Sequence, residues 1–329
     1  LHLSIRRQRQ MCIRDRDNLD ELRAAEDLEN FASIKIFMGA STGTLLVPDE
    51  ASLRAIFQGT RRLISVHAED EATLRELSGR LRQAGGRPSH NETRPPSAAA
   101  KSVALAVALA TEAAHPLHVC HASTALELSV LAQAPSSFIS VEASPHHLFL
   151  NEHAEEQLGC FVKVNPPLRA ESDRRALWRA LQEGRVQVVG TDHAPHSRQE
   201  KEQEYWTAPS GIPGLDTSLM TLLHAVRMGL LTLERLTDLT AAQPARIFRI
   251  EHKGRIDQGY DADLVLLSQE QARPLTEADL YSRCGWSPFT GWVLPPKPAR
   301  VWVRGVQVAE AGRVIRPDHR GLEVHFQRD

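Results

Sequence analysis

Residues 117–142 read LHVCHASTALELSVLAQAPSSFISVE and decide the fold of this chain. The stretch opens with a short apolar run at 117–121, continues with a helix-like pattern near 124–133, and closes with a second apolar run at 138–142. Two strands joined by one helix over this distance form a parallel pair. The stretch therefore predicts a parallel β-sheet with helices packed on its faces.

The same alternation of strand and helix extends in both directions along the chain. Further strands are expected at 33–38, 63–67 and 186–192, and further helices at 18–29, 48–58, 97–114 and 172–183. Residues 84–96 are rich in Gly, Pro, Ser and Asn, and a loop of that length inside such a unit indicates a functional loop. Beyond residue 217, two helical stretches lead into short strands broken by Gly and Asp, which are typical of a small β-rich domain.

The composition is that of a globular chain with no strong charge bias. The 329 residues include 39 Lys and Arg against 41 Asp and Glu, a formal net charge of -2. Hydrophobic residues make up 42%, the mean hydropathy is -0.32, and no apolar run approaches the length of about 20 residues that spans a bilayer. We therefore expect no membrane span, no dedicated nucleic-acid surface and a cytoplasmic location. The four cysteines contain no Cys-x-x-Cys pair, so neither a disulfide framework nor a structural zinc knuckle is indicated.

The first residues have an unusual origin. Residues 9–16 read RQMCIRDR, which looks like the translation of a transposase adapter used to prepare DNA libraries. The alternatives are a native basic arm or a targeting peptide, but the stretch has neither an apolar core for secretion nor a clean amphipathic pattern for import. We therefore leave residues 1–16 out of the expected fold and place the start of native sequence near Asp17.

Polar side chains recur at or near the C-terminal ends of the predicted strands. Because those ends converge on one face of a parallel barrel, residues far apart in sequence become neighbours there. Imidazole and carboxylate are ligands that zinc accepts, so this set predicts a divalent metal pair. The residues are Lys35, His67, His121, Glu142, Asp192 and His193.

Lys35 fits a metal site only after chemical modification, since an ammonium group cannot bind a cation. A neutral lysine amine can add carbon dioxide, and the resulting carbamate can bridge two metals about 3.5–4 Å apart. Such a pair lowers the pKa of a bound water to near neutrality. Considered alone, Lys35 would be interpreted as a lysine on an edge strand. His67 and His121 would each be interpreted as a structural histidine held by hydrogen bonds. The combined pattern is more specific than any one residue.

The motifs resemble the cyclic amidohydrolases, and among these most closely the dihydroorotases. The resemblance covers nearly all of residues 17–326, and it implies a zinc-dependent barrel enzyme of pyrimidine biosynthesis that reversibly cyclises N-carbamoyl-L-aspartate to L-dihydroorotate. The motifs are KIFMGASTG (35–43), VHAEDE (66–71), HVCHAS (118–123), VEASPHHL (141–148), KVNPPLR (163–169), GTDHAPH (190–196), SGIPG (210–214) and CGWSPF (284–289).

The resemblance also implies a role for each metal-site residue. Lys35 would be the carboxylated bridge between zinc ions, of which the complete protein would hold one or two. His67 and His121 would bind the second zinc. Asp192 would bind the first zinc and carry a proton from the attacking water to the departing ring nitrogen. His193 and Glu142 would support these ligands from outside.

A second group of residues is expected to hold the substrate. Asn165 and His196 would supply donors to the dihydroorotate carboxylate, and the backbone around Gly211, Pro213 and Gly214 would line the ring. Hydantoinases and dihydropyrimidinases share the metal set, so the metal set does not choose among these substrates. Asn165 and His196 favour dihydroorotate, since hydantoinase-like chains are expected to carry other residues at both positions.

Part of the family pattern is not found in this sequence. The family places a His-x-His pair after the first barrel strand, and no such pair precedes Lys35. We therefore expect an α/β fold comprising an incomplete TIM-type (β/α)8 barrel over 17–250, with its first strands missing, and the C-terminal part of a small β-sandwich domain over 251–329. The first zinc would then have only Lys35 and Asp192, so the chain as given is expected to be inactive.

Two other interpretations stay open. The chain could be a noncatalytic dihydroorotase-like scaffold for aspartate transcarbamoylase, although every ligand position that the chain covers is intact. It could also be a hydantoinase-like or dihydropyrimidinase-like cyclic amidase. The expected assemblies are a homodimer and an association with aspartate transcarbamoylase.

Overall fold

The centre of the molecule is a parallel sheet. The structure is a computed structural model that describes residues 11–13, 19–26, 31–41, 46–135 and 137–327. Six parallel strands follow one another in chain order, as they do in the wall of a (β/α)8 barrel, and confirm the predicted α/β fold. They are β1 (Met11–Ile13), β2 (Ser33–Phe37), β3 (Ile64–His67), β4 (Leu117–Val119), β5 (Ile139–Ala143) and β6 (Val188–Val189).

The two faces of the sheet differ in chemistry, because successive side chains of a strand point to opposite sides. Lys35 pairs with Ser65, and Ser65 with His118, so these polar residues lie on one face. The alternate residues, among them Ile34, Ile64 and Val119, are fully buried in the main apolar cluster. The polar face is therefore the interior side of the barrel wall, and the apolar face is the side covered by helices.

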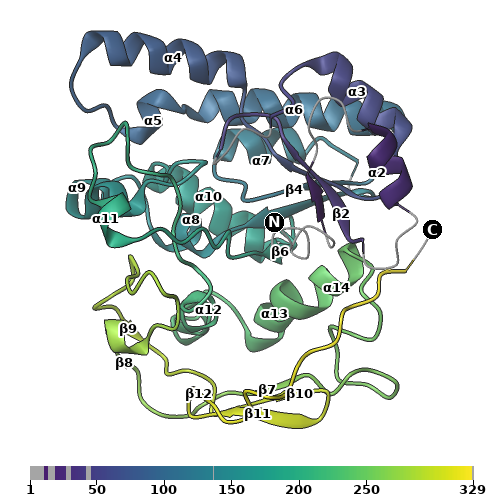
Figure 1. The fold of residues 1–329 in the computed structure, drawn as a ribbon, viewed down its shortest axis with the longest axis vertical. Helices are drawn as coiled ribbons and strands as arrows, with labels where there is room; N and C mark the ends of the chain where they lie inside the picture. Colours follow the sequence, from purple (N-terminus) through teal and green to yellow (C-terminus); the bar gives the residue numbers. More distant parts are fainter. Residues whose placement is uncertain (1–10, 14–18, 27–30, 42–45, 136, 328–329) are drawn as a thin grey trace.

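Helices pack on the apolar face and at the ends of the strands. In Figure 1, α3, α4 and α6 lie above the parallel sheet, while α12, α13 and α14 lie between it and a small antiparallel sheet. The helices up to β6 are α2 (Leu19–Ala25), α3 (Glu50–Gly59), α4 (Glu71–Ala84), α5 (His90–Thr93), α6 (Pro96–Ala113), α7 (Ala125–Leu131), α8 (Pro145–Phe149), α9 (Ala154–Leu158), the 3-10 turn η1 (Gly159–Val162) and α10 (Glu171–Gln182). Those after β6 are α11 (Arg198–Lys201), α12 (Ser218–Arg227), α13 (Leu233–Thr237), the π-helical turn η2 (Asp238–Ala242) and α14 (Gln243–Ile247).

Capping boxes fix where two short helices begin beside the strand ends. Thr124 and Glu127 cap each other's backbone at the start of α7, three residues after His121. Ser197 and Glu200 do the same at the start of α11, directly after His196. Because each box satisfies two backbone N–H groups at once, it sets the point at which the preceding loop must end.

The C-terminal region forms antiparallel structure, as its short, Gly-broken strands predicted. One sheet has the order β12-β11-β10-β7 and a second consists of β8 and β9. In Figure 1 the larger sheet lies at the far side of α12–α14 from the parallel sheet. The elements are β7 (Leu264–Leu266), β8 (Arg273–Pro274), η3 (Glu277–Asp279), β9 (Val293–Leu294), β10 (Arg300–Val303), β11 (Val306–Glu310) and β12 (Arg313–Val314).

The N-terminal strand β1 differs from expectation. Met11–Ile13 pair in parallel with β2, although they fall within residues 1–16, which we expected to take no part in the fold. An unpaired strand edge presents a row of free backbone groups, so a neighbouring segment of almost any sequence can pair with it. Residues 1–10 and 14–18 lie outside the described residues, and the non-native origin of 1–16 stays a prediction.

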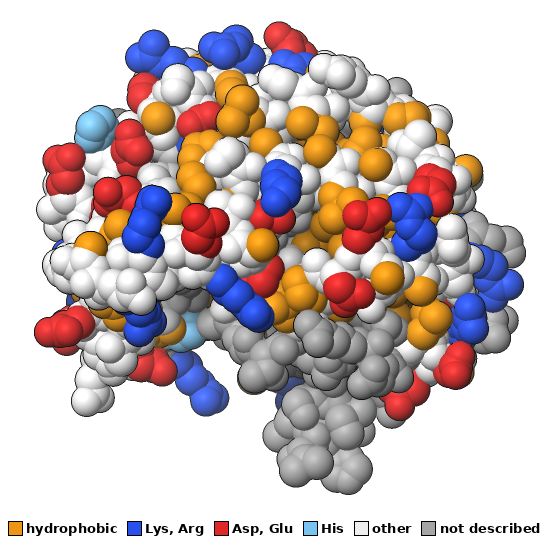
Figure 2. Space-filling view, turned by 90° about the horizontal axis from the view of Figure 1, so that it is seen from above, with side chains coloured by type: hydrophobic (Ala, Val, Ile, Leu, Met, Phe, Trp, Pro, Cys, Tyr) orange, Lys and Arg blue, Asp and Glu red, His pale blue; other side chains and the backbone are white. Residues whose placement is uncertain are grey.

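The outer surface carries charges of both signs. Figure 2 shows Lys and Arg interspersed with Asp and Glu on the face above the helices, without a large field of one sign. Within the described ranges, no helix is both long enough and apolar enough to cross a membrane.

Candidate active site

Two predicted metal ligands meet at the C-terminal ends of β3 and β4. Nδ1 of His67 lies 3.1 Å from Nε2 of His121, and both rings are buried. Burial lowers the pKa of both imidazoles, so both are neutral at pH 7. Two nitrogens bound to one tetrahedral zinc at about 2.0–2.1 Å are separated by about 3.3 Å. The pair therefore has nearly the spacing that a shared zinc requires.

Glu69 determines which nitrogen of His67 is free to bind a metal. Its Oε2 lies 3.1 Å from His67 Nε2, and its side chain has no exposed surface. Burial alone would raise the pKa of Glu69, but Arg94 and His67 outweigh it and hold that pKa well below its usual range. A charged carboxylate at this position favours the proton on Nε2. The lone pair of Nδ1 is then directed at His121.

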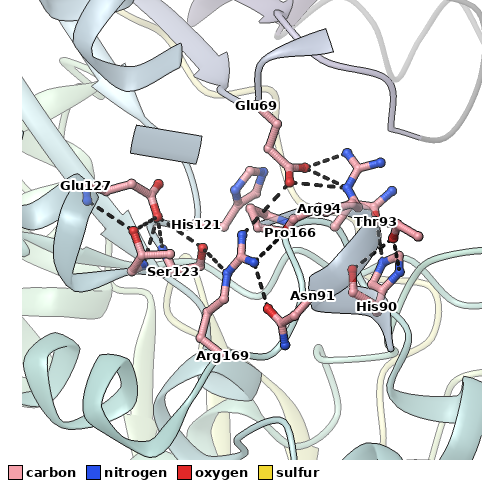
Figure 3. Close-up of polar contacts among 12 residues, drawn as sticks. Glu69, His90, Asn91, Thr93, Arg94, His121, Ser123, Glu127, Pro166 and Arg169 are labelled. Carbon is pink, nitrogen blue, oxygen red and sulfur yellow. Dashed lines mark hydrogen bonds and ion pairs between the residues drawn. The ribbon is translucent and has the colours of Figure 1, made fainter. Parts of the chain in front are cut away.

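Glu69 is itself held by two arginines (Figure 3). Arg94 Nε lies 3.0 Å from Glu69 Oε2, and an Arg169 terminal nitrogen lies 4.0 Å from Oε1. Arg169 also donates to the backbone oxygen of Arg94 at 2.5 Å and to Asn91 Oδ1 at 2.8 Å. Arg169 thus supports the Glu69 network and the 84–96 loop.

Lys35 lies among the other predicted ligands. Its Nζ is 3.0 Å from Cys120 Sγ, and its charge lowers the pKa of His67, His121 and Asp192. A charge acts over several ångströms, so Lys35 lies near all three of these groups.

Asp192 occupies a buried position after β6. Burial raises its pKa to about 6, with Lys35 opposing the shift and Glu142 adding to it. Both Asp192 (φ 44) and His121 (φ 37) adopt the left-handed backbone region, which costs non-glycine residues about 1 kcal/mol or more. Strain of this kind collects where a fold must aim a functional side chain.

Three further potential ligands lie close to Lys35. The ligand atoms of His118, Cys120 and Glu142 are all within 4.8 Å of one another. His118 Nε2 is buried without a hydrogen bond, 3.6 Å from Glu142 Oε2. Gly190 leaves room for the Glu142 carboxylate, because a Cβ at that position would lie 2.3 Å from Oε2. Glu142 therefore adjoins the site, as its expected supporting role requires.

The predicted substrate residues lie on loops that are tied to these strand ends. Asn165 is buried. The backbone oxygen of the neighbouring Pro166 lies 3.0 Å from His147 Nε2. The His147 ring in turn contributes to the lowered pKa of His121. His196 Nε2 contacts the Ser210 oxygen at 3.2 Å. The Asn165 loop therefore lies near His121, and His196 is tied to the loop 210–214.

The loop 210–214 packs directly against the segment after Asp192. A Cβ on Gly211 would lie 2.5 Å from the Ala194 oxygen, so only glycine allows this approach. His193 Nδ1 accepts hydrogen bonds from the backbone N–H groups of Gly214 and Leu215, at 3.2 and 3.1 Å. His193 thus holds the loop that carries Pro213, a different contact from the expected one to Asp192.

Several residues of the site escaped the sequence analysis. Glu69 and Arg94 support a ligand, His90 contacts Asn165, and Lys201 is buried against three backbone oxygens. For Glu69 a signal existed, since it stands two residues after His67 in the VHAEDE motif. His90 contacts Asn165, which is 75 residues away in the sequence, and Lys201 contacts Lys163, which is 38 residues away. The spacing of residues in the sequence does not reveal such contacts.

The sequence of the chain matches those of known proteins. Residues 51–308 match the model of the Amidohydrolase family. A dihydroorotase from Halobacterium salinarum is 40% identical over 299 residues, covering 90% of this chain and 69% of the relative. The chain belongs to the amidohydrolases and, within them, to the dihydroorotases. A dihydroorotase from Pyrococcus furiosus is 34% identical over 283 residues, covering 85% of this chain and 62% of the relative.

Solved amidohydrolase structures share the fold. Dihydropyrimidinase from Brevibacillus agri superposes with a TM-score of 0.86 at 27% identity, covering 93% of this chain and 69% of that one. L-hydantoinase from Arthrobacter aurescens superposes with a TM-score of 0.85 at 30% identity, covering 91% of this chain and 69% of that one. The chain thus spans between three fifths and three quarters of the length of these four proteins.

Replacing Glu69 with glutamine is expected to weaken zinc binding about 10- to 100-fold, the usual cost of losing a carboxylate partner of a ligating histidine. The variant keeps the shape but removes the charge that favours the His67 Nε2 proton. Competition with a chromophoric chelator measures the change. The control is Glu76→Gln, an exposed glutamate on α4. Equal affinities for wild type and Glu69→Gln would show that Glu69 does not act through His67.

Proposed function

We propose that this protein is a dihydroorotase that reversibly hydrolyses L-dihydroorotate to N-carbamoyl-L-aspartate. The carrying observation is that His67 and His121 meet after β3 and β4, with Lys35 near enough to lower the pKa of both and of Asp192. The 40% identity to a dihydroorotase supports the same conclusion.

The residues present fit one zinc ion. His67 and His121 offer neutral imidazole nitrogens at a suitable spacing, and Lys35 would complete the set after carboxylation. When bound, zinc polarises a carbonyl and activates a water molecule. Asp192, with a pKa of about 6, is mainly ionised at pH 7, so its carboxylate can accept a proton and later donate it.

The family's pattern leaves a second zinc with too few ligands. At that position it provides Lys35 and Asp192, and the family's His-x-His pair does not precede Lys35. We infer that residues 1–329 by themselves bind one zinc and turn over slowly.

The zinc-loaded chain of 329 residues is therefore expected to hydrolyse dihydroorotate well below the usual enzyme range of about 1–10³ s⁻¹. Chromatographic separation of N-carbamoyl-L-aspartate from dihydroorotate measures the rate. Turnover inside that range would show that the residues present are a sufficient catalytic set.

The function itself is tested on the product of the full reading frame, established by long-read sequencing upstream of the Asp17 codon. We expect kcat/KM for dihydroorotate to exceed that for hydantoin or a dihydropyrimidine at least about 100-fold, because donors placed for a carboxylate are left unpaired by substrates without one. His196→Ala should lower kcat/KM for dihydroorotate and leave the small rate on hydantoin unchanged. A preference for hydantoin would overturn the proposal.

The cyclic amidase alternative is supported by the solved structures, which are hydantoinases and dihydropyrimidinases. It predicts the opposite substrate preference in the same assay. The scaffold alternative predicts little zinc in the product of the full reading frame, together with binding to aspartate transcarbamoylase.

A further inference from the structure

A series of buried hydrogen bonds connects the 84–96 loop to Asn165. His90 is 5% exposed, and its Nε2 lies 2.8 Å from Asn165 Oδ1. On the other side of the ring, Nδ1 lies 2.7 Å from the Tyr205 hydroxyl. Thr93 Oγ1 contacts the same hydroxyl at 2.8 Å. Three segments far apart in sequence are thus joined through one imidazole.

The protonation states of His90 and Tyr205 limit which atoms can donate in this series of hydrogen bonds. Burial lowers the pKa of His90 to about 3, with Arg94 contributing in the same sense, so the ring carries a single N–H at pH 7. Burial raises the pKa of Tyr205 to about 12, which keeps its hydroxyl protonated. Because Asn165 places its acceptor Oδ1 toward the ring, Nε2–H donates to Oδ1, and Nδ1 accepts from the Tyr205 hydroxyl. The amide N–H groups of Asn165 are then left to donate elsewhere.

The loop that carries Tyr205 is firmly anchored. Lys163 Nζ donates to the backbone oxygens of Tyr205 and Ala208, at 2.6 Å each. Lys201, which is 1% exposed, donates to the oxygens of Lys163, Pro209 and Gly211. These contacts bind the Tyr205 loop to the segment leading into Asn165 and to the loop 210–214.

We propose that His90 is a positioning residue that holds Asn165 with its amide N–H groups toward the substrate, and that Tyr205 sets the imidazole tautomer that this requires. The inference rests on the proposed function, because it assigns Asn165 to an anionic substrate that needs hydrogen-bond donors. The proposal also gives a role to the Gly- and Pro-rich 84–96 segment, because this segment carries His90.

The alternative tautomer makes the opposite prediction. With the proton on Nδ1, His90 Nε2 becomes an acceptor, and Asn165 must turn its amide nitrogen toward the ring. Its oxygen would then face the substrate carboxylate, and two acceptors would oppose each other. The orientation that His90 imposes on the Asn165 amide therefore affects the binding of anionic ligands specifically.

The test combines calorimetric binding of L-dihydroorotate to the zinc-loaded chain with ¹⁵N NMR of the His90 ring. In wild type we expect a protonated Nε2 and an unprotonated Nδ1. His90→Leu should weaken binding about 10-fold or more, the usual cost of losing a hydrogen bond to a charged group. His90→Gln should restore most of the affinity, because its amide nitrogen can donate to Asn165 Oδ1.

Coupling between the two residues supplies the decisive comparison. If His90 acts through Asn165, the double variant His90→Leu/Asn165→Ala should bind no more weakly than Asn165→Ala alone. Additive losses, or a ring protonated at Nδ1 in wild type, would overturn the inference. Tyr205→Phe should give a mixture of tautomers and an intermediate affinity. Absence of dihydroorotate binding by wild type with the expected tautomer would count against the proposed function instead, because the NMR reading of His90 does not depend on the ligand.

Discussion

His67→Ala is expected to remove tightly bound zinc from this protein and to lower its zinc affinity more than about 100-fold. His67 supplies one of two neutral nitrogens at 3.1 Å spacing, and alanine leaves His121 with Lys35 alone. Loss of a direct ligand should exceed the 10- to 100-fold cost of losing a residue that only supports one. Zinc content after dialysis, measured by inductively coupled plasma mass spectrometry, reports the result.

Two controls separate this effect from general damage. His153→Ala changes a histidine whose side chain is 70% exposed, and it should keep wild-type zinc content. Circular dichroism should show that His67→Ala remains folded. Retention of zinc by folded His67→Ala, with its loss in Cys120→Ser, would place the ion at the His118, Cys120 and Glu142 group instead.

The zinc-free protein is expected to lose stability steeply between pH 7 and pH 5. Burial lowers the pKa of several histidines, most strongly to about 3 for His90, to about 4 for His147 and well below the usual value for His121 and His146. The unfolded chain binds protons at these sites below about pH 6.5 and the folded chain does not. Stability therefore falls as the pH falls, by about 2 kcal/mol for each histidine at pH 5.

Two buried carboxyl groups oppose this trend. The pKa of Asp192 is raised to about 6, so the folded state takes up a proton there before the unfolded state does. Burial also raises the pKa of Glu127. These contributions have the opposite sign and offset part of the loss. The net expectation is still a decrease of several kcal/mol, measured by urea unfolding at a series of pH values.

His146→Leu isolates one contribution to this pH dependence. His146 is buried, and its Nε2 has no hydrogen-bond partner, so leucine removes a titrating group without breaking a bond at that atom. The proton uptake on unfolding should fall by about one. His153→Leu, at the exposed position, should leave the pH dependence unchanged. An unaltered slope in His146→Leu would contradict the assignment.

The parallel sheet could be predicted because alternation of apolar runs and amphipathic helices is a local signal. Helix α6, expected at 97–114, spans Pro96–Ala113, and α10, expected at 172–183, spans Glu171–Gln182. The last parallel strand was harder to delimit. The run 186–192 forms a strand only at Val188–Val189, because the chain then turns out of the sheet to bring Asp192 into the site.

The positions of the proposed metal ligands in the fold could be predicted, whereas the contacts that support them could not. Lys35, His67 and His121 each stand in a strand or at its end, where the fold alone brings them together. Glu69, Arg94 and His90 act through contacts between loops, whose paths depend on packing rather than on a repeating pattern. The buried carboxylate of Glu69 is stable only because Arg94 and His67 meet it in three dimensions.

The most direct test of the account is the position of zinc in a crystal of the zinc-loaded protein, located by anomalous diffraction at the zinc edge. We predict a peak between His67 Nδ1 and His121 Nε2, with density extending from Lys35 Nζ toward it as a carbamate. A peak at the His118, Cys120 and Glu142 group alone, or no peak at full zinc loading, would contradict the proposed active site.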